Sequence, residues 1–330
     1  MADQWEKQSE RGAQFWILFS AWVYRIFGRT LTLAIISPAI LFYFLTGKPA
    51  RRASRAYLTR AHKLGLIDKT PGYWSSLSHF MSFAGSLVDK LGAWTGKVSA
   101  KDVEGSDDPD FTAAKTSGKG GLILTAHIGN PELIRAVATV ERRFAVTVLM
   151  HTRNAENYNN VLKKFSPTSR VNIVEVDSID VTVAMELSAA VERGEWVVMA
   201  ADRLPPREHK EQDSVAVDFL AEKADLPVGP YVLAAALKCP VYFLVCVRTA
   251  RKQPFKIVFR EFTEQVTLPR RNRLDAIRKL AQKYADLLTE VVHIAPYQWF
   301  NFYDYWGEFD DHAKTTKHSD TIQAENRTQS

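Results

Sequence analysis

The pattern of apolar and polar positions divides the chain into an apolar N-terminal part, a long alternating middle part and a polar end. Short apolar runs bounded by turn residues are typical of strands, and six of them lie at 121–126, 145–150, 171–176, 196–201, 240–247 and 255–260. Amphipathic stretches predict helices at 50–66, 73–92, 131–142, 155–165, 179–193, 229–238 and 272–292. Strands that alternate with helices predict an α/β domain with a mostly parallel central sheet flanked by helices. Residues 101–120 are polar, and we expect a loop there.

The N-terminal part contains two apolar runs. Residues 31–46 carry no charge, and residues 15–27 are interrupted only by Arg25, with Gly28 and Arg29 between the two runs. A 16-residue helix rises about 24 Å, which is less than the roughly 30 Å of a bilayer's hydrocarbon core. We therefore expect two membrane-associated helices that lie in one leaflet, or one of which spans. The alternative is an ordinary buried helix hairpin.

The charged residues sharpen this picture. The chain has 43 Lys and Arg against 37 Asp and Glu, a surplus too small to indicate nucleic-acid binding. From Lys48 to Lys63, however, there are six cations and no acid, directly after the apolar runs. Such a block favours the cytoplasmic side of a membrane and attracts anionic headgroups. We expect anchoring helices over 1–47, a globular domain over 48–310, and a polar disordered tail over 311–330.

The candidate chemistry lies in residues 121–132, which read GLILTAHIGNPE. His127 follows the predicted strand, and Asn130-Pro131 is a helix-start signal that puts Glu132 in the first helical turn. Ligands of open α/β sheets bind at the carboxyl ends of strands. There, a carboxylate can orient the imidazole and stabilise the imidazolium. The pair can deprotonate a hydroxyl for direct attack on a thioester, and the alternative is a structural hydrogen bond.

The same segment resembles the H-x4-D/E signature of the lysophospholipid acyltransferase superfamily. More narrowly, His127-x-Gly129-Asn130-x-Glu132 resembles the branch that contains the late acyltransferases of lipid A biosynthesis. The resemblance covers about residues 15–306 and includes an ordered set of later blocks. These are Arg153-Asn154, Asp202-Arg203, Phe219-Leu220, Leu226-Pro227-Val228-Gly229-Pro230, Pro240-Val241 and Gln298-Trp299-Phe300-Asn301-Phe302-Tyr303.

The resemblance implies a role for each matching residue. His127 would be the general base and Glu132 its orienting partner. Asp202 and Arg203 would hold the donor carbonyl or phosphate, or stabilise the oxyanion, because a guanidinium suits negative charge. The alternative for Arg203 is a structural ion pair. Further substrate or oxyanion contacts are expected from three more residues, namely Arg153, Asn130 and Gly129.

Two departures from the family pattern concern the acceptor. Relatives often have Phe-x-Gly-Arg/Lys where this chain has Phe219-Leu220-Ala221-Glu222-Lys223, and many have an aromatic residue where this chain has Pro131. The catalytic residues are kept, but lipid A itself is no longer the obvious acceptor. The chain is similar to a shorter subgroup, some of whose members are associated with unusual acyl lipids such as aryl-polyene-type lipids.

The expected function is transfer of a fatty acyl or related polyene acyl group to a lipid or glycolipid hydroxyl or amine. The donor would be an acyl carrier protein or coenzyme A thioester, with no bound cofactor or metal. The expected location is the cytoplasmic face of a bacterial inner membrane. A membrane lipid hydrolase and a non-catalytic partner of a lipid-synthesis complex are the alternatives. A G-x-S-x-G nucleophile elbow and a phosphate-binding Gly-rich loop are absent from the sequence.

Two further features complete the sequence. Cys239 and Cys246 lie in an apolar stretch and are expected to be buried thiols, which suits a reducing compartment. Residues 297–306 read YQWFNFYDYW, seven aromatics in ten positions. We expect this segment to pack beneath the active site, to line an acyl groove or to lie at the membrane interface.

Overall fold

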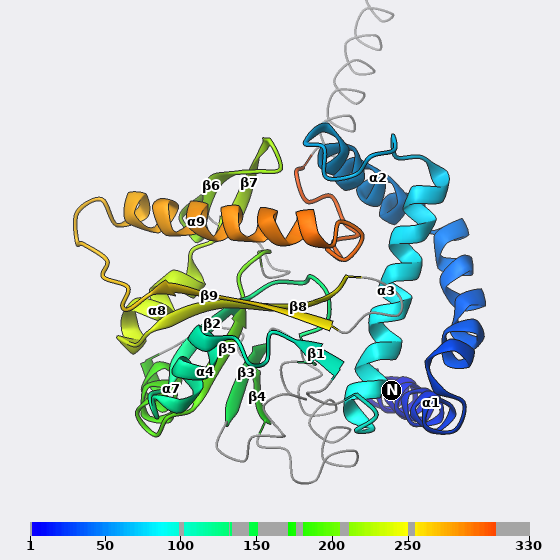
Figure 1. The fold of residues 1–330 in the computed structure, drawn as a ribbon, viewed down its shortest axis with the longest axis horizontal. Helices are drawn as coiled ribbons and strands as arrows, with labels where there is room; N and C mark the ends of the chain where they lie inside the picture. Colours follow the sequence, from blue (N-terminus) through cyan, green and yellow to red (C-terminus); the bar gives the residue numbers. More distant parts are fainter. Residues whose placement is uncertain are drawn as a thin grey trace, which may run out of the picture.

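A computed structural model describes residues 2–98, 102–131, 133, 145–150, 171–175, 181–204, 211–249 and 255–307. Its described part is built on a central sheet whose strands follow the order β1-β9-β8-β2-β5-β3-β4 (Figure 1). The strands are β1 Val103–Glu104, β2 Gly121–Thr125, β3 Val146–Met150, β4 Val171–Glu175, β5 Trp196–Ala200, β8 Val241–Arg248 and β9 Phe255–Thr263.

The sheet is mostly parallel, as the alternation of strands and helices predicted. Strands β8, β2, β5, β3 and β4 run in one direction. Strand β9 pairs antiparallel with β8, and the edge strand β1 pairs parallel with β9, so β9 and β1 run the other way. The carboxyl ends of the five parallel strands therefore share one edge of the sheet, which is where such sheets bind ligands.

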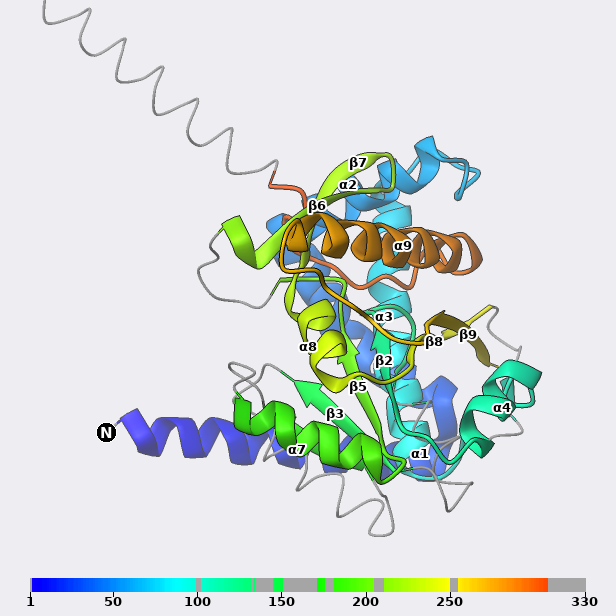
Figure 2. The same ribbon diagram turned by 90° about the vertical axis from the view of Figure 1, so that its left-hand side faces the viewer.

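Helices cover both faces of the sheet. Leu122 and Leu124 of β2 belong to the larger core cluster, whereas Ile123 belongs to the smaller one on the opposite face, as expected from alternating side chains. The larger cluster includes residues of α2 Lys48–Lys63, α7 Val181–Glu192, α8 Gly229–Leu237 and α9 Arg273–Ile294. The smaller cluster includes residues of α3 Tyr73–Trp94 and α4 Pro109–Thr116. Figure 2 shows α8 and α9 from the side.

The sequence prediction missed the short strand β1, which lies in the expected loop at 101–120, and two further elements. The expected loop at 101–120 contains α4, whose N-cap Asp108 accepts hydrogen bonds from the backbone of Asp110 and Phe111. The loop prediction was wrong because it followed the polar composition rather than the Asp108-Pro109 helix start. The second element is the antiparallel hairpin of β6 Ser214–Phe219 and β7 Glu222–Pro227, preceded by the short 3₁₀ turn Glu211–Asp213.

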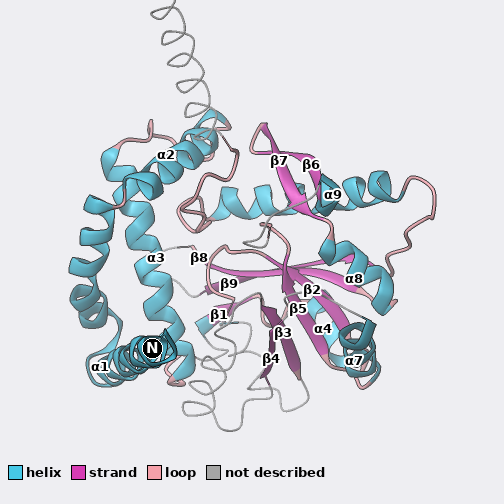
Figure 3. Ribbon diagram, turned by 180° about the vertical axis from the view of Figure 1, so that it is seen from behind, coloured by secondary structure: helices cyan, strands magenta, loops and turns pink. Residues whose placement is uncertain are grey.

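The N-terminal helix α1 runs from Ala2 to Thr46 and turns at Gly28, whose φ of 74° and ψ of −172° are not helical. The predicted break between the two apolar runs is thus confirmed. Beyond the turn, the helix lies alongside α3, as Figures 1 and 3 both show. Phe19–Thr46 is long and apolar enough to cross a membrane. Nearly all of the predicted helix 131–142, and all of helix 155–165 and of the tail 311–330, lies outside the described residues.

Candidate active site

The register of the sheet brings His127 and Asp202 together. Strands β2 and β5 are parallel neighbours, and Thr125 pairs with Ala200 at their carboxyl ends. His127 and Asp202 each lie two residues beyond these paired positions. The two chains therefore leave the sheet side by side, and their side chains meet at its ligand-binding edge.

Both oxygens of the Asp202 carboxylate contact His127. His127 Nδ1 lies 2.7 Å from Asp202 Oδ1. The other carboxylate oxygen accepts hydrogen bonds from the backbone N–H of His127 at 3.0 Å and from Trp299 Nε1 at 3.1 Å. The Asp202 side chain is fully buried, whereas 41% of the His127 side chain is exposed. The imidazole of His127 is thus accessible to solvent, whereas the carboxylate that it contacts is buried.

The charge of Asp202 is maintained by its partners. Burial raises the pKa of its carboxyl group, but the charge and hydrogen bonds of His127 and the charge of Arg203 lower it more, to about 2. The group is therefore ionised at neutral pH, and it is the natural acceptor for an N–H of the imidazole.

Arg203 also reaches the imidazole, because its Nε lies 2.8 Å from His127 Nδ1. One ring nitrogen cannot donate to Asp202 and accept from Arg203 at the same time. The ionised carboxylate favours the tautomer with the proton on Nδ1, since this bond is charge-assisted. In that tautomer Nε2 carries the lone pair, and the guanidinium adds positive charge beside the ring.

The aromatic segment 297–306 packs beneath the site, which was one of the three places expected for it. Trp299 is fully buried, and its ring contacts those of Phe219 and Tyr305 at centroid distances of 5.2 and 4.8 Å. The backbone N–H of Phe300 donates to the His127 carbonyl at 2.8 Å. The Tyr305 hydroxyl donates to the Asp202 carbonyl at 2.8 Å. The segment therefore contacts the main chains of both His127 and Asp202.

A second histidine supports this segment from behind. His79 of α3 is fully buried, with Nε2 2.9 Å from the Trp299 carbonyl and Nδ1 3.0 Å from Ser54 Oγ of α2. Ser76 Oγ in turn donates to Ser54 Oγ at 2.8 Å. Burial lowers the pKa of His79 to about 4, so its ring is neutral. The sequence analysis did not single out His79, because a histidine on an amphipathic helix carries no motif.

Gly129 and Asn130 shape the loop after His127. Gly129 has a φ of +64°, and a Cβ there would lie 2.0 Å from the Cys246 carbonyl oxygen, so only glycine fits this position. The N–H of Gly129 donates to the Gln298 carbonyl, and the N–H of Asn130 donates to the Cys246 carbonyl. Ser86 Oγ donates to the Gly129 carbonyl at 2.8 Å. In this conformation both N–H groups are already engaged within the protein.

The remaining predicted site residues, Glu132 and Arg153, lie outside the described residues. Pairing of Glu132 with His127 therefore stays a prediction. Within the described ranges, no group of three or more His, Cys, Asp or Glu is placed to hold a metal ion.

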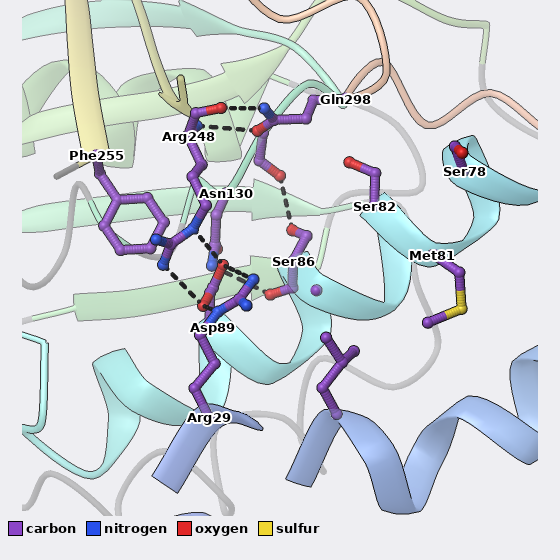
Figure 4. Close-up of a pocket in the computed structure, with 13 residues that line it drawn as sticks. Arg29, Ser78, Met81, Ser82, Ser86, Asp89, Asn130, Arg248, Phe255 and Gln298 are labelled. Atoms are coloured by element: carbon purple, nitrogen blue, oxygen red, sulfur yellow. Dashed lines mark hydrogen bonds and ion pairs between the residues drawn. The ribbon is translucent and has the colours of Figure 1, made fainter. Parts of the chain in front are cut away.

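A cavity of about 430 Å³ is lined in part by Gly129 and Asn130 (Figure 4). Its walls come from α1, α3, the loop, the strand ends of β8 and β9, and the side chain of Gln298. At its floor, Arg29 and Arg248 both bind the buried carboxylate of Asp89. His127 is not among the residues that line this cavity.

Comparison with known proteins supports one family. A family model described as bacterial lipid A biosynthesis acyltransferase matches residues 81–307, more than half of the chain. The matched range includes His127, Asp202 and Trp299. No curated protein matches the chain.

Proposed function

Because the chain belongs to the bacterial lipid A biosynthesis acyltransferase family, we propose that it moves an acyl group from a thioester to a membrane lipid acceptor. The family supports a lipid acyltransferase activity in general. The observation that carries the finer proposal is the 2.7 Å contact between the exposed imidazole of His127 and the buried carboxylate of Asp202. This contact leaves Nε2 as the basic nitrogen at the ligand-binding edge of the sheet.

In the proposed reaction His127 acts as the general base. Nε2 accepts the proton of the acceptor hydroxyl or amine while that oxygen or nitrogen attacks the thioester carbonyl carbon. The tetrahedral intermediate collapses, the C–S bond breaks, and the imidazolium returns the proton to the leaving thiolate. Since the acceptor attacks directly, no acyl-enzyme is needed.

Asp202 is proposed as the group that orients His127. A buried anion held by His127, its backbone N–H and Trp299 fixes the tautomer and stabilises the imidazolium when Nε2 is protonated. This is the role that the sequence analysis expected of Glu132. A negative carboxylate bound to the base does not suit the donor carbonyl, so we assign Asp202 to the base.

Arg203 is the described residue best suited to the developing oxyanion. The N–H groups of Gly129 and Asn130 are engaged with protein carbonyls. The guanidinium of Arg203 has several donors, of which Nε faces His127. Its remaining N–H groups are proposed to stabilise the tetrahedral oxyanion, because a cation placed where charge develops lowers the barrier.

The substrates are proposed from the family and the charge pattern. The donor is an acyl carrier protein or coenzyme A thioester that carries a fatty acyl or related polyene acyl group, and the acceptor is a lipid or glycolipid. An acidic donor suits a basic protein with a net charge of +6. The proposed location is the cytoplasmic face of a bacterial inner membrane, to which the basic helix α2 after the apolar helix α1 lends support.

The test is acyl transfer from radiolabelled acyl thioesters to lipid extracts, with the full chain in membranes. His127→Ala should lower transfer by at least about a thousandfold, because a general base and its alignment are lost together. The matched control is His293→Ala, since His293 is exposed on α9. Full transfer by His127→Ala would overturn the assignment. Release of free fatty acid without transfer by the wild type would instead indicate a hydrolase.

A further inference from the structure

We infer that the apolar helix α1 does not cross the membrane but lies against a single leaflet, packed on α3. The surface that faces the lipid is then the outer side of α1 together with the start of α3. The inference uses the membrane location of the proposed function but not its acyl-transfer chemistry. It also goes beyond hydropathy, since by length and composition Phe19–Thr46 qualifies as a spanning helix.

The first argument is an ion cluster in the middle of the apolar segment. Arg29 Nε lies 2.7 Å from Asp89 Oδ1 on α3, and Arg248 Nη2 lies 3.0 Å from the same oxygen. Figure 4 shows the two arginines reaching Asp89 from opposite sides, one from α1 and one from the end of β8. The cluster joins the apolar helix directly to the central sheet.

This cluster is incompatible with a spanning α1. If Phe19–Thr46 straightened into one spanning helix, Arg29, ten residues in, would lie about 15 Å along it, near mid-depth of a bilayer. Its partners Asp89 and Arg248 would have to enter the hydrocarbon with it. Arg248 ends a strand of the central sheet, and open sheet edges are not tolerated in lipid. Spanning would therefore require the buried ion pairs to break.

The second argument is that both halves of α1 are fixed to α3. Before the turn at Gly28, Ala21 and Tyr24 pack with Val88, Leu91 and Trp94 in one buried cluster. After it, the fully buried Phe44 packs edge-to-face on Tyr73 and Phe80, at centroid distances of 4.7 and 5.2 Å. The two halves thus contact opposite ends of α3, and both lie on the same side of the molecule (Figures 1 and 3).

The outer side of this assembly is suited to lipid. Large apolar side chains that are about half exposed or more point away from the protein, among them Trp22, Ile26, Phe27, Phe42, Tyr43 and Trp74. Trp and Tyr favour the membrane interface. At the end of α1 the chain enters α2, whose exposed Arg52 and Arg55 provide cations. An apolar face bordered by cations fits a leaflet with anionic headgroups.

Topology gives the decisive test. Single cysteines are introduced in the full chain at Gln4, near the start of α1, and at Glu264, which is exposed after β9. The native Cys239 and Cys246 are buried. A membrane-impermeant maleimide is added to sealed inside-out and right-side-out vesicles from producing cells. We expect both cysteines to react in the same vesicle orientation. Reaction in opposite orientations would show that α1 spans and would overturn the inference.

A second measurement tests the lipid-facing surface. Phe42→Asp, at a side chain that is 62% exposed, should weaken binding to phosphatidylcholine–phosphatidylglycerol vesicles about tenfold or more. The control is Met185→Asp on α7, where the native side chain is 68% exposed, and it should bind like the wild type. Equal binding by both variants would overturn the assigned surface. Loss of transfer by His127→Ala with vesicle binding retained would separate the chemistry from this inference.

Discussion

At the scale of single residues, the site depends on one buried carboxylate with several partners. Asp202 contacts the His127 ring, the His127 backbone and the Trp299 indole, while its own carbonyl accepts from Tyr305. The exposed ring of His127 therefore owes its position to the buried groups of Asp202 and Trp299. Such supporting groups hold a catalytic ring within the narrow range of productive geometry.

Asp202→Asn tests this role. The amide keeps the shape but removes the charge and can hold the imidazole in the wrong tautomer, so we expect kcat to fall by about a thousandfold to ten-thousandfold with little change in KM. Steady-state kinetics with the thioester donor measure this split. Glu132→Gln is the comparison. If it reduces kcat more than Asp202→Asn does, the orienting role belongs to Glu132.

His79 should make the stability of the protein depend on pH. Its pKa is about 4 when folded and near 6.5 when unfolded, so between these values the unfolded chain binds the additional proton. Its contribution is complete above pH 6.5 and is lost as the pH falls toward 4, by about 3 kcal/mol at most. Urea unfolding of the solubilised full chain at several pH values measures this.

The variant His79→Gln keeps a donor and an acceptor but does not titrate, so its unfolding free energy should fall less over the same pH range. His293→Gln, at an exposed position of α9, should behave like the wild type. An unchanged slope in His79→Gln would contradict the prediction.

At the scale of elements, the β6–β7 hairpin gives a reason for one departure from the family pattern. Its two-residue turn consists of Leu220 and Ala221, with φ values of 52° and 62°. Hairpin turns with positive φ at both positions favour glycine, and relatives often have glycine where this chain has Ala221. The presence of Ala221 instead of glycine therefore affects the backbone conformation of the turn, and not only the acceptor contacts that the sequence analysis considered.

Ala221→Gly should stabilise the protein by about 1 kcal/mol or less, because relief of the left-handed conformation exceeds the added freedom of the unfolded chain. Thermal unfolding would show a rise of a few degrees at most. The matched control is Ala216→Gly in β6, where φ is not positive, and it should destabilise. Destabilisation by both substitutions would show that the turn is not strained.

The six strands that apolar runs predicted are observed close to their predicted bounds, although β9 is longer and β1, β6 and β7 were missed. Which strands are neighbours in the sheet was not predictable. Predicted strand 121–126 is observed as Gly121–Thr125, and 255–260 is observed as Phe255–Thr263. Apolar runs bounded by turns carry that information locally. The contact between His127 and Asp202 depends on β2 lying next to β5, and strand order is set by packing of the whole domain. A sequence motif could indicate only a partner that is close to His127 in the sequence, and it indicated Glu132.

At the scale of the whole molecule, the apolar helix α1 and the central sheet form one assembly through α3. The sequence predicted an apolar N-terminal part with a break at Gly28; the break is present, and Phe19–Thr46 is long and apolar enough to cross a membrane. What hydropathy could not give is the partner of Arg29, because Asp89 is 60 residues away and Arg248 is 219 residues away. Only the folded chain shows that these charges meet.

The clamp on Asp202 by Trp299 and Tyr305 has a consequence for biosynthesis of the protein itself. A ribosome makes the strands that carry His127 and Asp202 well before it makes residues 297–306. Until that late segment docks, the carboxylate lacks the indole N–H, and its main chain lacks the Tyr305 bond. The nascent chain therefore contains both His127 and Asp202 before it contains the segment whose contacts hold Asp202 in place.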